Sequence, residues 1–309
     1  MSFRLKDQFY TKPEVANFCF GEFKKVAKEL CLDLDKYHYI EPSAGCGHFY
    51  RLLPPKRRIG IDIEPRKSPM LKEDLSKLIK SDYLKWNPPN DGKKYIVIGN
   101  PPFGVRGRLA LDFINKSYPY ADVVAFILPQ LFNSDGKGVA GKRVMGYKLA
   151  YNRPLAINSF VYPDGKEIAI NTVFQIWTKV NIERIKIKKR KTCDTYIKVY
   201  SLSDGGLPSN TRNKNMIGKC DIYLPSTTFS GMKAYSSFEK LPHRRGYGIV
   251  ILKNKKEIKK LLIKNNWEKT AFLSTNSALN LRTSLIQDIV TKAGYCDKNI
   301  NICKFQKLF

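Results

Sequence analysis

The sequence predicts an α/β protein with a doubly wound, mainly parallel sheet and a smaller basic C-terminal domain. Short apolar runs alternate with helical segments over the first 180 residues, which is typical of such a sheet. Polar or glycine residues follow each apolar run. The chain, at 309 residues, is also long for a single hydrophobic core. We therefore expect one domain over 1–180 and a second over 181–309.

The expected elements start with a helix. Thr11-Lys12-Pro13-Glu14 has the form of a capping box, and apolar residues recur behind it at helical spacing. A helix is therefore expected over 12–30. The remaining expectations for this domain are strands over 37–40, 58–63, 95–98, 123–128 and 170–177, helical segments over 48–53 and 108–117, and a helix or irregular crossover around 69–79.

Two segments interrupt the alternation. Residues 133–146 hold four glycines together with Lys142 and Arg143, which predicts a mobile basic loop. The basic run 181–191 is expected to leave the first domain. In the second domain, 204–208 is another break, and 255–262 is expected to form an amphipathic helix with a basic face.

The charge of the chain favours a nucleic-acid partner. Its 55 Lys and Arg against 27 Asp and Glu give a net charge of +28. Residues 179–309 hold 27 of these basic and 9 of the acidic residues, so +18 of the excess lies there. A polyanion is the usual partner of such a surface because neutralised phosphates release counterions. An anionic membrane surface and a genome bias toward Lys and Asn are the alternatives.

Cysteine and histidine usage argues against a metal site. The seven cysteines are scattered without a Cys-x-x-Cys pair, and there are three histidines. Free thiols fit a reducing compartment. The chain starts without an apolar signal segment and has no apolar stretch of membrane-spanning length, so we expect an intracellular protein of the cytoplasm or nucleoid.

The most informative segment is 95–104. It places Asn100-Pro101-Pro102-Phe103 in a loop at the carboxyl end of a strand, where open α/β sheets bind their ligands. The amide, the carbonyls beside the two prolines and the phenyl ring could together hold an exocyclic amine and stack on its ring. Asn87-Pro88-Pro89-Asn90 is similar but follows no apolar strand, and it is expected to be an ordinary turn.

Other strand ends carry residues that suit a nucleoside ligand. Gly45 and Gly47 allow the backbone to approach a ligand closely. Asp62 is placed to accept the hydroxyls of a ribose, Asp82 to accept from an adenine amine, and Tyr83 to pack on the ring. A plain tight turn and solvated carboxylates are the structural alternatives.

These motifs, in this order, resemble those of class I S-adenosylmethionine-dependent methyltransferases with a Rossmann-like fold. The resemblance covers residues 8–178 and is specific to the gamma-class adenine-N6 DNA methyltransferases of restriction–modification systems. It implies that S-adenosylmethionine is the cofactor. The residues that the resemblance implies for binding it are Tyr10, Thr11, Glu41, Pro42, Ala44, Gly45, Gly47, Asp62, Ile63, Asp82, Tyr83 and Asn100.

The resemblance also implies a mechanism. The Asn100 side-chain oxygen and the Pro101 carbonyl would accept the two N6 hydrogens of a flipped-out adenine, within the catalytic motif that Pro102 and Phe103 complete. Phe103 and Tyr162 would stack on the base. Val161-Tyr162-Pro163 matches the family's second aromatic segment loosely, so Phe160 and Phe174 are alternatives to Tyr162.

Basic residues are the expected contacts to double-stranded DNA. Arginines rank above lysines as readers of bases, while lysines mainly set salt-dependent affinity. The named contacts are Lys142, Arg143, Arg212, Lys214, Arg244 and Arg245. We expect a monomer; the resemblance allows a cognate restriction endonuclease in the same system, but the sequence does not reveal whether one exists. An RNA methyltransferase acting on adenine N6 or guanine N2, a protein glutamine methyltransferase and a non-catalytic nucleic-acid-binding subunit remain alternatives.

Overall fold

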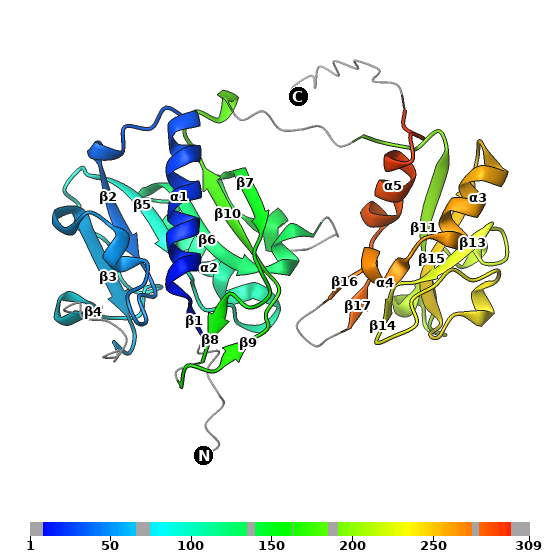
Figure 1. The fold of residues 1–309 in the computed structure, drawn as a ribbon, viewed down its shortest axis with the longest axis horizontal. Coiled ribbons are helices and arrows are strands. Elements are labelled where there is room, and N and C mark those ends of the chain that lie inside the picture. Colours follow the sequence, from blue (N-terminus) through cyan, green and yellow to red (C-terminus); the bar gives the residue numbers. More distant parts are fainter. Residues whose placement is uncertain are drawn as a thin grey trace. The chain divides into compact units, whose positions relative to one another are not determined.

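The computed structural model describes residues 9–65, 75–134, 140–162, 164–184, 191–273 and 278–297 (Figure 1). The chain folds into two compact units, Met1–Ile187 and Lys188–Phe309. Each unit has its own hydrophobic core. We describe them separately.

Unit 1 is built on a seven-stranded sheet, as far as the described residues show, in the order β4-β3-β2-β5-β6-β10-β7. The strands from β4 to β6 are parallel, and β10 is antiparallel to both β6 and β7. The predicted Rossmann-like, doubly wound and mainly parallel sheet is confirmed. The strands are β2 (Tyr37–Glu41), β3 (Arg58–Asp62), β4 (Ile79–Lys80), β5 (Lys94–Gly99), β6 (Ala121–Pro129), β7 (Lys148–Pro154) and β10 (Thr172–Thr178).

The order of the strands reverses at β2. The chain runs from β2 outward through β3 to β4, and then returns to place β5 on the other side of β2. Ligands of open α/β sheets bind at such a switch point, outside the carboxyl ends of the strands. The loop that starts at Asn100 leaves β5 at this point.

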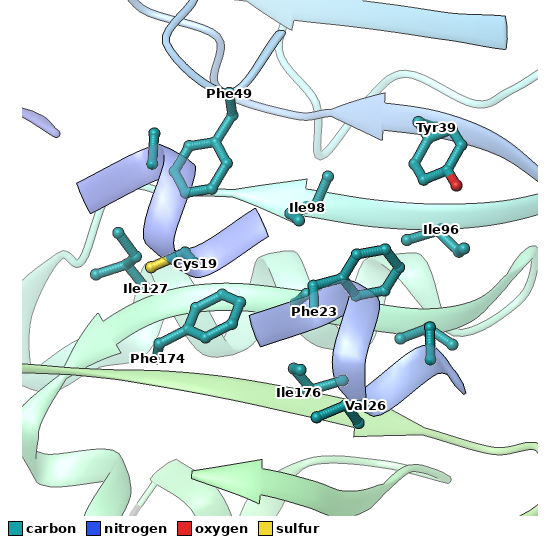
Figure 2. Close-up of a cluster of buried hydrophobic side chains, with 14 of the residues drawn as sticks. Cys19, Phe23, Val26, Tyr39, Phe49, Ile96, Ile98, Ile127, Phe174 and Ile176 are labelled. Atoms are coloured by element: carbon teal, nitrogen blue, oxygen red, sulfur yellow. The ribbon is translucent and has the colours of Figure 1, made fainter. Parts of the chain in front are cut away.

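Helices cover the two faces of the sheet. α1 (Pro13–Glu29) packs its apolar side on one face, and Figure 2 shows its Cys19, Phe23 and Val26 in one buried cluster with Ile96 and Ile98 of β5 and Ile176 of β10. α2 (Arg108–Ser117) packs against the opposite face, in a cluster that contains Val97. Because β6 is covered on both faces, its residues 123–129 are all buried, which explains its continuous apolar sequence.

A small second sheet joins distant parts of unit 1. β1 (Tyr10–Thr11) pairs with β8 (Phe160–Val161), and β8 pairs with β9 (Glu167–Ile168). An ion pair between Lys12 and Glu167 links the same segments. This sheet brings Tyr10 and Thr11, two of the residues expected to bind the cofactor, next to the segment that carries Tyr162.

Several expectations for unit 1 need correction. The helical segment expected over 48–53 is one 3-10 turn, because the prolines at 54–55 stop it. β7 was not predicted. Residues 69–74 of the crossover, 135–139 of the basic loop and 185–190 of the connector lie outside the described residues. The 3-10 turns are η1 (Leu34–Lys36), η2 (Tyr50–Leu52), η3 (Pro55–Arg57), η4 (Leu75–Lys77), η5 (Val105–Gly107), η6 (Gln130–Asn133), η7 (Ala140–Arg143) and η8 (Ile182–Arg184).

Unit 2 contains an antiparallel sheet of order β12-β11-β15-β13, with an apolar cluster on each side. The described part of unit 2 also contains a smaller sheet, of order β14-β17-β16, and three helices. The helix expected over 255–262 is α3, which buries Ile258 and Leu262. The elements are β11 (Ile197–Asp204), β12 (Thr211–Arg212), β13 (Ile222–Pro225), β14 (Thr227–Thr228), β15 (Arg245–Ile251), β16 (Phe272–Leu273), β17 (Leu279–Asn280), α3 (Lys255–Lys264), α4 (Trp267–Thr270), α5 (Thr283–Lys292), η9 (Pro208–Asn210), η10 (Lys214–Met216) and η11 (Phe238–Lys240).

Candidate active site

A cavity of about 480 Å³ opens at the carboxyl ends of β2, β3 and β5. The structure brings most of the sequence-predicted cofactor and catalytic residues together around it. The predicted residues that line it are Tyr10, Thr11, Glu41, Pro42, Ala44, Gly45, Asp62, Ile63, Asp82, Tyr83, Asn100, Pro101 and Pro102. Gly47, Phe103 and Tyr162 do not line it in this conformation.

The Gly-rich turn is held against the end of β3. The Gly45 amide donates to Asp62 Oδ2 at 2.7 Å, and the Glu64 amide donates to Asp62 Oδ1 at 2.8 Å. Gly45 has a φ of 54°, and a Cβ there would lie 3.2 Å from the Tyr10 ring. A side chain is therefore disfavoured at Gly45 both by the backbone and by the space. Gly47 also has a positive φ and shapes the turn from outside the cavity.

Asn100 presents a buried oxygen that the protein leaves unpaired. Among the described residues, Asn100 Oδ1 has no hydrogen-bond partner. The similar segment at 87–90 behaves differently, since Asn87 Oδ1 accepts from Lys116 Nζ at 2.8 Å. A buried unpaired acceptor costs about 1–3 kcal/mol, which a ligand that donates a hydrogen would recover. The side-chain oxygens of the two Asn-Pro-Pro segments thus differ in their hydrogen bonding.

Glu41 is a second buried group that faces the cavity. Its side chain is at the end of β2, the residue is 2% exposed, and Oε2 has no partner within the described part of the chain. Burial raises the pKa of Glu41 well above its usual value, and the nearby Asp62 carboxylate raises it further. A ligand that places a hydrogen-bond donor or a positive charge next to this carboxyl would offset part of its desolvation cost.

His48 adds an acceptor that was not predicted from the sequence. His48 Nδ1 lies 2.6 Å from the Thr11 carbonyl oxygen, which can only accept, so Nδ1 carries a proton. Burial lowers the pKa of His48, and the neutral ring then leaves Nε2 as an acceptor. Nε2 and the Thr11 hydroxyl are both buried without a partner among the described residues. The proximity of His48 to Gly47 in the sequence was the available signal.

The far wall of the cavity comes from the segment after β4 and from α2. Asp82 Oδ1 accepts from the Leu84 amide at 3.0 Å. The Tyr83 ring is 5.0 Å from the Phe113 ring, and its hydroxyl bonds to Ser117 Oγ at 2.7 Å. The contribution of α2 was not predicted, although Leu109 and Phe113 are four residues apart on one helix face.

The aromatic residues proposed for base stacking lie in different environments. Phe103 is 6% exposed, and its ring centroid is 5.3 Å from that of Phe9, which does line the cavity. Tyr162 is 39% exposed, just after β8, whereas Phe160 and Phe174 are fully buried. Exposure therefore favours Tyr162 over its two alternatives. Pro163 lies outside the described residues.

The predicted nucleic-acid contacts are all exposed. Lys142 and Arg143 end η7 in unit 1. Arg212, Lys214, Arg244 and Arg245 lie in unit 2. Within the described ranges, His, Cys, Asp and Glu side chains form no group that could hold a metal ion, and no helix is apolar and long enough to cross a membrane.

Comparisons with known proteins give structural likenesses only. No protein-family model matches the sequence, and no curated protein matches it. A candidate RNA methyltransferase from Pyrococcus horikoshii is 21% identical over 60% of this chain and 88% of its own, with a TM-score of 0.42. A candidate class I S-adenosylmethionine-dependent methyltransferase from Listeria monocytogenes is 14% identical over 61% and 66%, with a TM-score of 0.41. A chain of a type I R-M system is 14% identical over 55% and 42%, with a TM-score of 0.38. The function proposed below therefore rests on the site itself.

Proposed function

We propose that this protein transfers a methyl group from S-adenosylmethionine to N6 of an adenine that is flipped out of double-stranded DNA. The observation that carries this proposal is the unpaired, buried Asn100 Oδ1 in a cavity at the switch point of the sheet. An exocyclic amine supplies the hydrogen that this oxygen lacks. The Pro101 carbonyl is the second acceptor for the same amine.

The residues that line the cavity suit each part of the cofactor. Gly45 lines the cavity without a side chain, and Asp62 offers a carboxylate to ribose hydroxyls. Asp82 and Tyr83 offer an acceptor and a ring to adenine. Glu41, Thr11 and His48 supply polar atoms for the amino-acid end. When bound, S-adenosylmethionine supplies a methyl group that its sulfonium already activates.

The residues of the chain then orient the target amine. Its nitrogen lone pair is delocalised into the adenine ring, so the amine is a weak nucleophile. Two acceptors on its hydrogens draw the nitrogen toward tetrahedral geometry and favour the positive charge that develops on it. Stacking on Phe103 and Tyr162 offsets the cost of removing the base from the duplex.

Duplex DNA is the proposed substrate because the excess of basic residues is concentrated in unit 2. Unit 2 carries most of the net charge of +28 and has a folded core of its own, which fits a recognition domain beside a catalytic one. RNA shares the phosphate chemistry and is the alternative outcome of the test. A binding subunit without catalysis would have no need to keep Asn100 Oδ1 unpaired and buried.

The test compares the two Asn-Pro-Pro segments. The protein is incubated with labelled S-adenosylmethionine and duplex DNA, single-stranded DNA or RNA, and mass spectrometry identifies the methylated nucleoside. We expect N6-methyladenine in duplex DNA, loss of turnover with retained cofactor binding in Asn100→Ala, and full activity in the matched control Asn87→Ala. Turnover by Asn100→Ala at the wild-type rate would refute the proposal.

A further inference from the structure

Four basic residues that are scattered in the sequence meet at one end of the main sheet of unit 2. Arg212 ends β12, Lys214 begins η10, Arg245 begins β15, and Arg244 directly precedes that strand. All four are exposed. Asp204, at the end of β11, lies among them, and we call these five residues the strand-end cluster. Its formal charge is +3.

Asp204 holds two of these cations in place. Lys214 Nζ is 3.1 Å from Asp204 Oδ1, and Arg244 Nη2 is 2.5 Å from Asp204 Oδ2. Arg244 Nε also donates to the Asp204 carbonyl at 3.1 Å, while the Asp204 amide donates to the Arg244 carbonyl at 3.0 Å. The side chain of Asp204 is 14% exposed, against 77% for Arg244 and 64% for Lys214. The Asp204 carboxylate is thus largely covered, whereas Arg244 and Lys214 are exposed to solvent.

The two remaining arginines form a row on the sheet. Arg212 and Arg245 both pair directly with Ser203, one from each neighbouring strand. Directly paired residues point to the same face of an antiparallel sheet, so both arginine side chains extend from one face. Their Cα atoms are about 10 Å apart, the width of two strand spacings. Asp204 follows Ser203 and points to the other face, where it meets Arg244.

We propose that the strand-end cluster is a clamp for the phosphate backbone of double-stranded DNA and that Asp204 is its positioning residue. This proposal rests on the function proposed above for its choice of partner. Arg244 keeps N–H groups that Asp204 does not use, and a fixed guanidinium can hold a phosphate through two parallel bonds. Because Asp204 already holds Arg244 and Lys214 in the free protein, these side chains lose less conformational entropy when DNA binds.

The geometry of the cluster favours duplex DNA over duplex RNA. The end of this sheet, with Arg212 and Arg245 on the two strands that flank β11, fits the wide major groove of B-form DNA, which admits a β-ribbon. The major groove of A-form RNA is too narrow for side chains to enter. Selective binding of RNA to the cluster is therefore an outcome that would contradict the proposal.

The decisive experiment is Asp204→Asn, because two explanations predict opposite signs. If the cluster only adds charge, removing an anion should tighten DNA binding. If Asp204 positions the cations, binding should weaken by about fivefold or more although the net charge rises, since preorganised charged bonds are lost. Affinity is measured for duplex DNA, single-stranded DNA and RNA over a range of salt concentrations. Unchanged or tighter DNA binding overturns the proposal.

A matched control removes the same charge elsewhere in unit 2. Asp221 pairs with Lys255 at 2.7 Å and accepts from the Ile251 amide, away from the strand-end cluster. Asp221→Asn should leave DNA affinity unchanged or slightly tighter. Arg212→Gln and Arg245→Gln should each reduce the slope of log affinity against log salt by about 0.9, as expected for one phosphate contact. Thermal unfolding of each variant reports on its folding.

Binding is measured without turnover, so the two proposals can fail separately. If no methylated nucleoside forms but duplex binding depends on Asp204, the methyl-transfer proposal fails and the clamp stands. If DNA is methylated while Asp204→Asn binds as tightly as the wild type, the clamp fails and the methyl-transfer proposal stands.

Discussion

The amide of Gly45 donates to the Asp62 carboxylate at 2.7 Å and ties the turn after β2 to the end of β3. The other oxygen of Asp62 accepts from the Glu64 amide. Asp62 therefore fixes the backbone of a turn that lines the cavity, in addition to the ligand contact proposed for its carboxylate. The ligand contact was predicted from the sequence, and the role in the turn was not.

We expect Asp62→Asn to weaken the binding of S-adenosylmethionine by about 10- to 100-fold, since one amide loses a charged acceptor worth about 1.5–3 kcal/mol. Calorimetric titration measures this affinity. Asp91→Asn is the control, because Asp91 is also an acid near a strand but pairs with Lys93 outside the cavity. Equal affinities of wild type and Asp62→Asn would contradict the role of Asp62 in the turn.

Glu41 leads to a prediction about pH and stability. Burial raises the pKa of its carboxyl above the usual 4.5, so between pH 4.5 and the raised pKa the folded protein binds a proton that the unfolded chain has released. The contribution of Glu41 to the free energy of unfolding is therefore full below pH 4.5 and decreases as pH rises through this window. Glu41→Gln keeps a neutral side chain and should lack this decrease.

Denaturant unfolding of wild type and Glu41→Gln at several pH values measures the difference. The variant should gain stability relative to wild type as pH rises above 4.5. A difference between the two proteins that is constant with pH would show that Glu41 is not held protonated. Glu14→Gln, a change at an exposed position on α1, serves as a control for the loss of an acid.

Much of unit 1 was predictable because its signals are local. The Pro13 start and helical periodicity located α1, and apolar runs located β2, β3, β5, β6 and β10. The polar residues after β2, β3 and β5 could be assigned to one site, because parallel strands bring their carboxyl ends to one edge. Asn100 and Asn87 could be separated from their local sequences alone, and their hydrogen bonds differ accordingly.

What the sequence could not predict depends on contacts between distant segments. β1 and β8 are two residues long, and their pairing joins positions 10–11 to 160–161. The sequence of β7 lacks a continuous apolar run, because this strand lies at the edge of the sheet and is largely exposed. His48 is oriented in the cavity by a hydrogen bond to the carbonyl of Thr11, a residue far from it in sequence. The same limit applies to Asp204, whose partners Lys214 and Arg244 lie 10 and 40 residues away.

The assignment of the second stacking aromatic is the last prediction. Tyr162 is 39% exposed, so Tyr162→Ala should leave the melting temperature nearly unchanged. It should lower kcat/KM for DNA by about 5- to 150-fold, because stacking is worth about 1–3 kcal/mol per base. Phe160→Ala is the comparison, since Phe160 is fully buried and its truncation should cost about 3–5 kcal/mol of stability. If the Tyr162→Ala variant methylates DNA at the wild-type rate, Tyr162 does not stack on the base. Phe9 is then the next aromatic residue to test, because it lines the cavity and contacts Phe103.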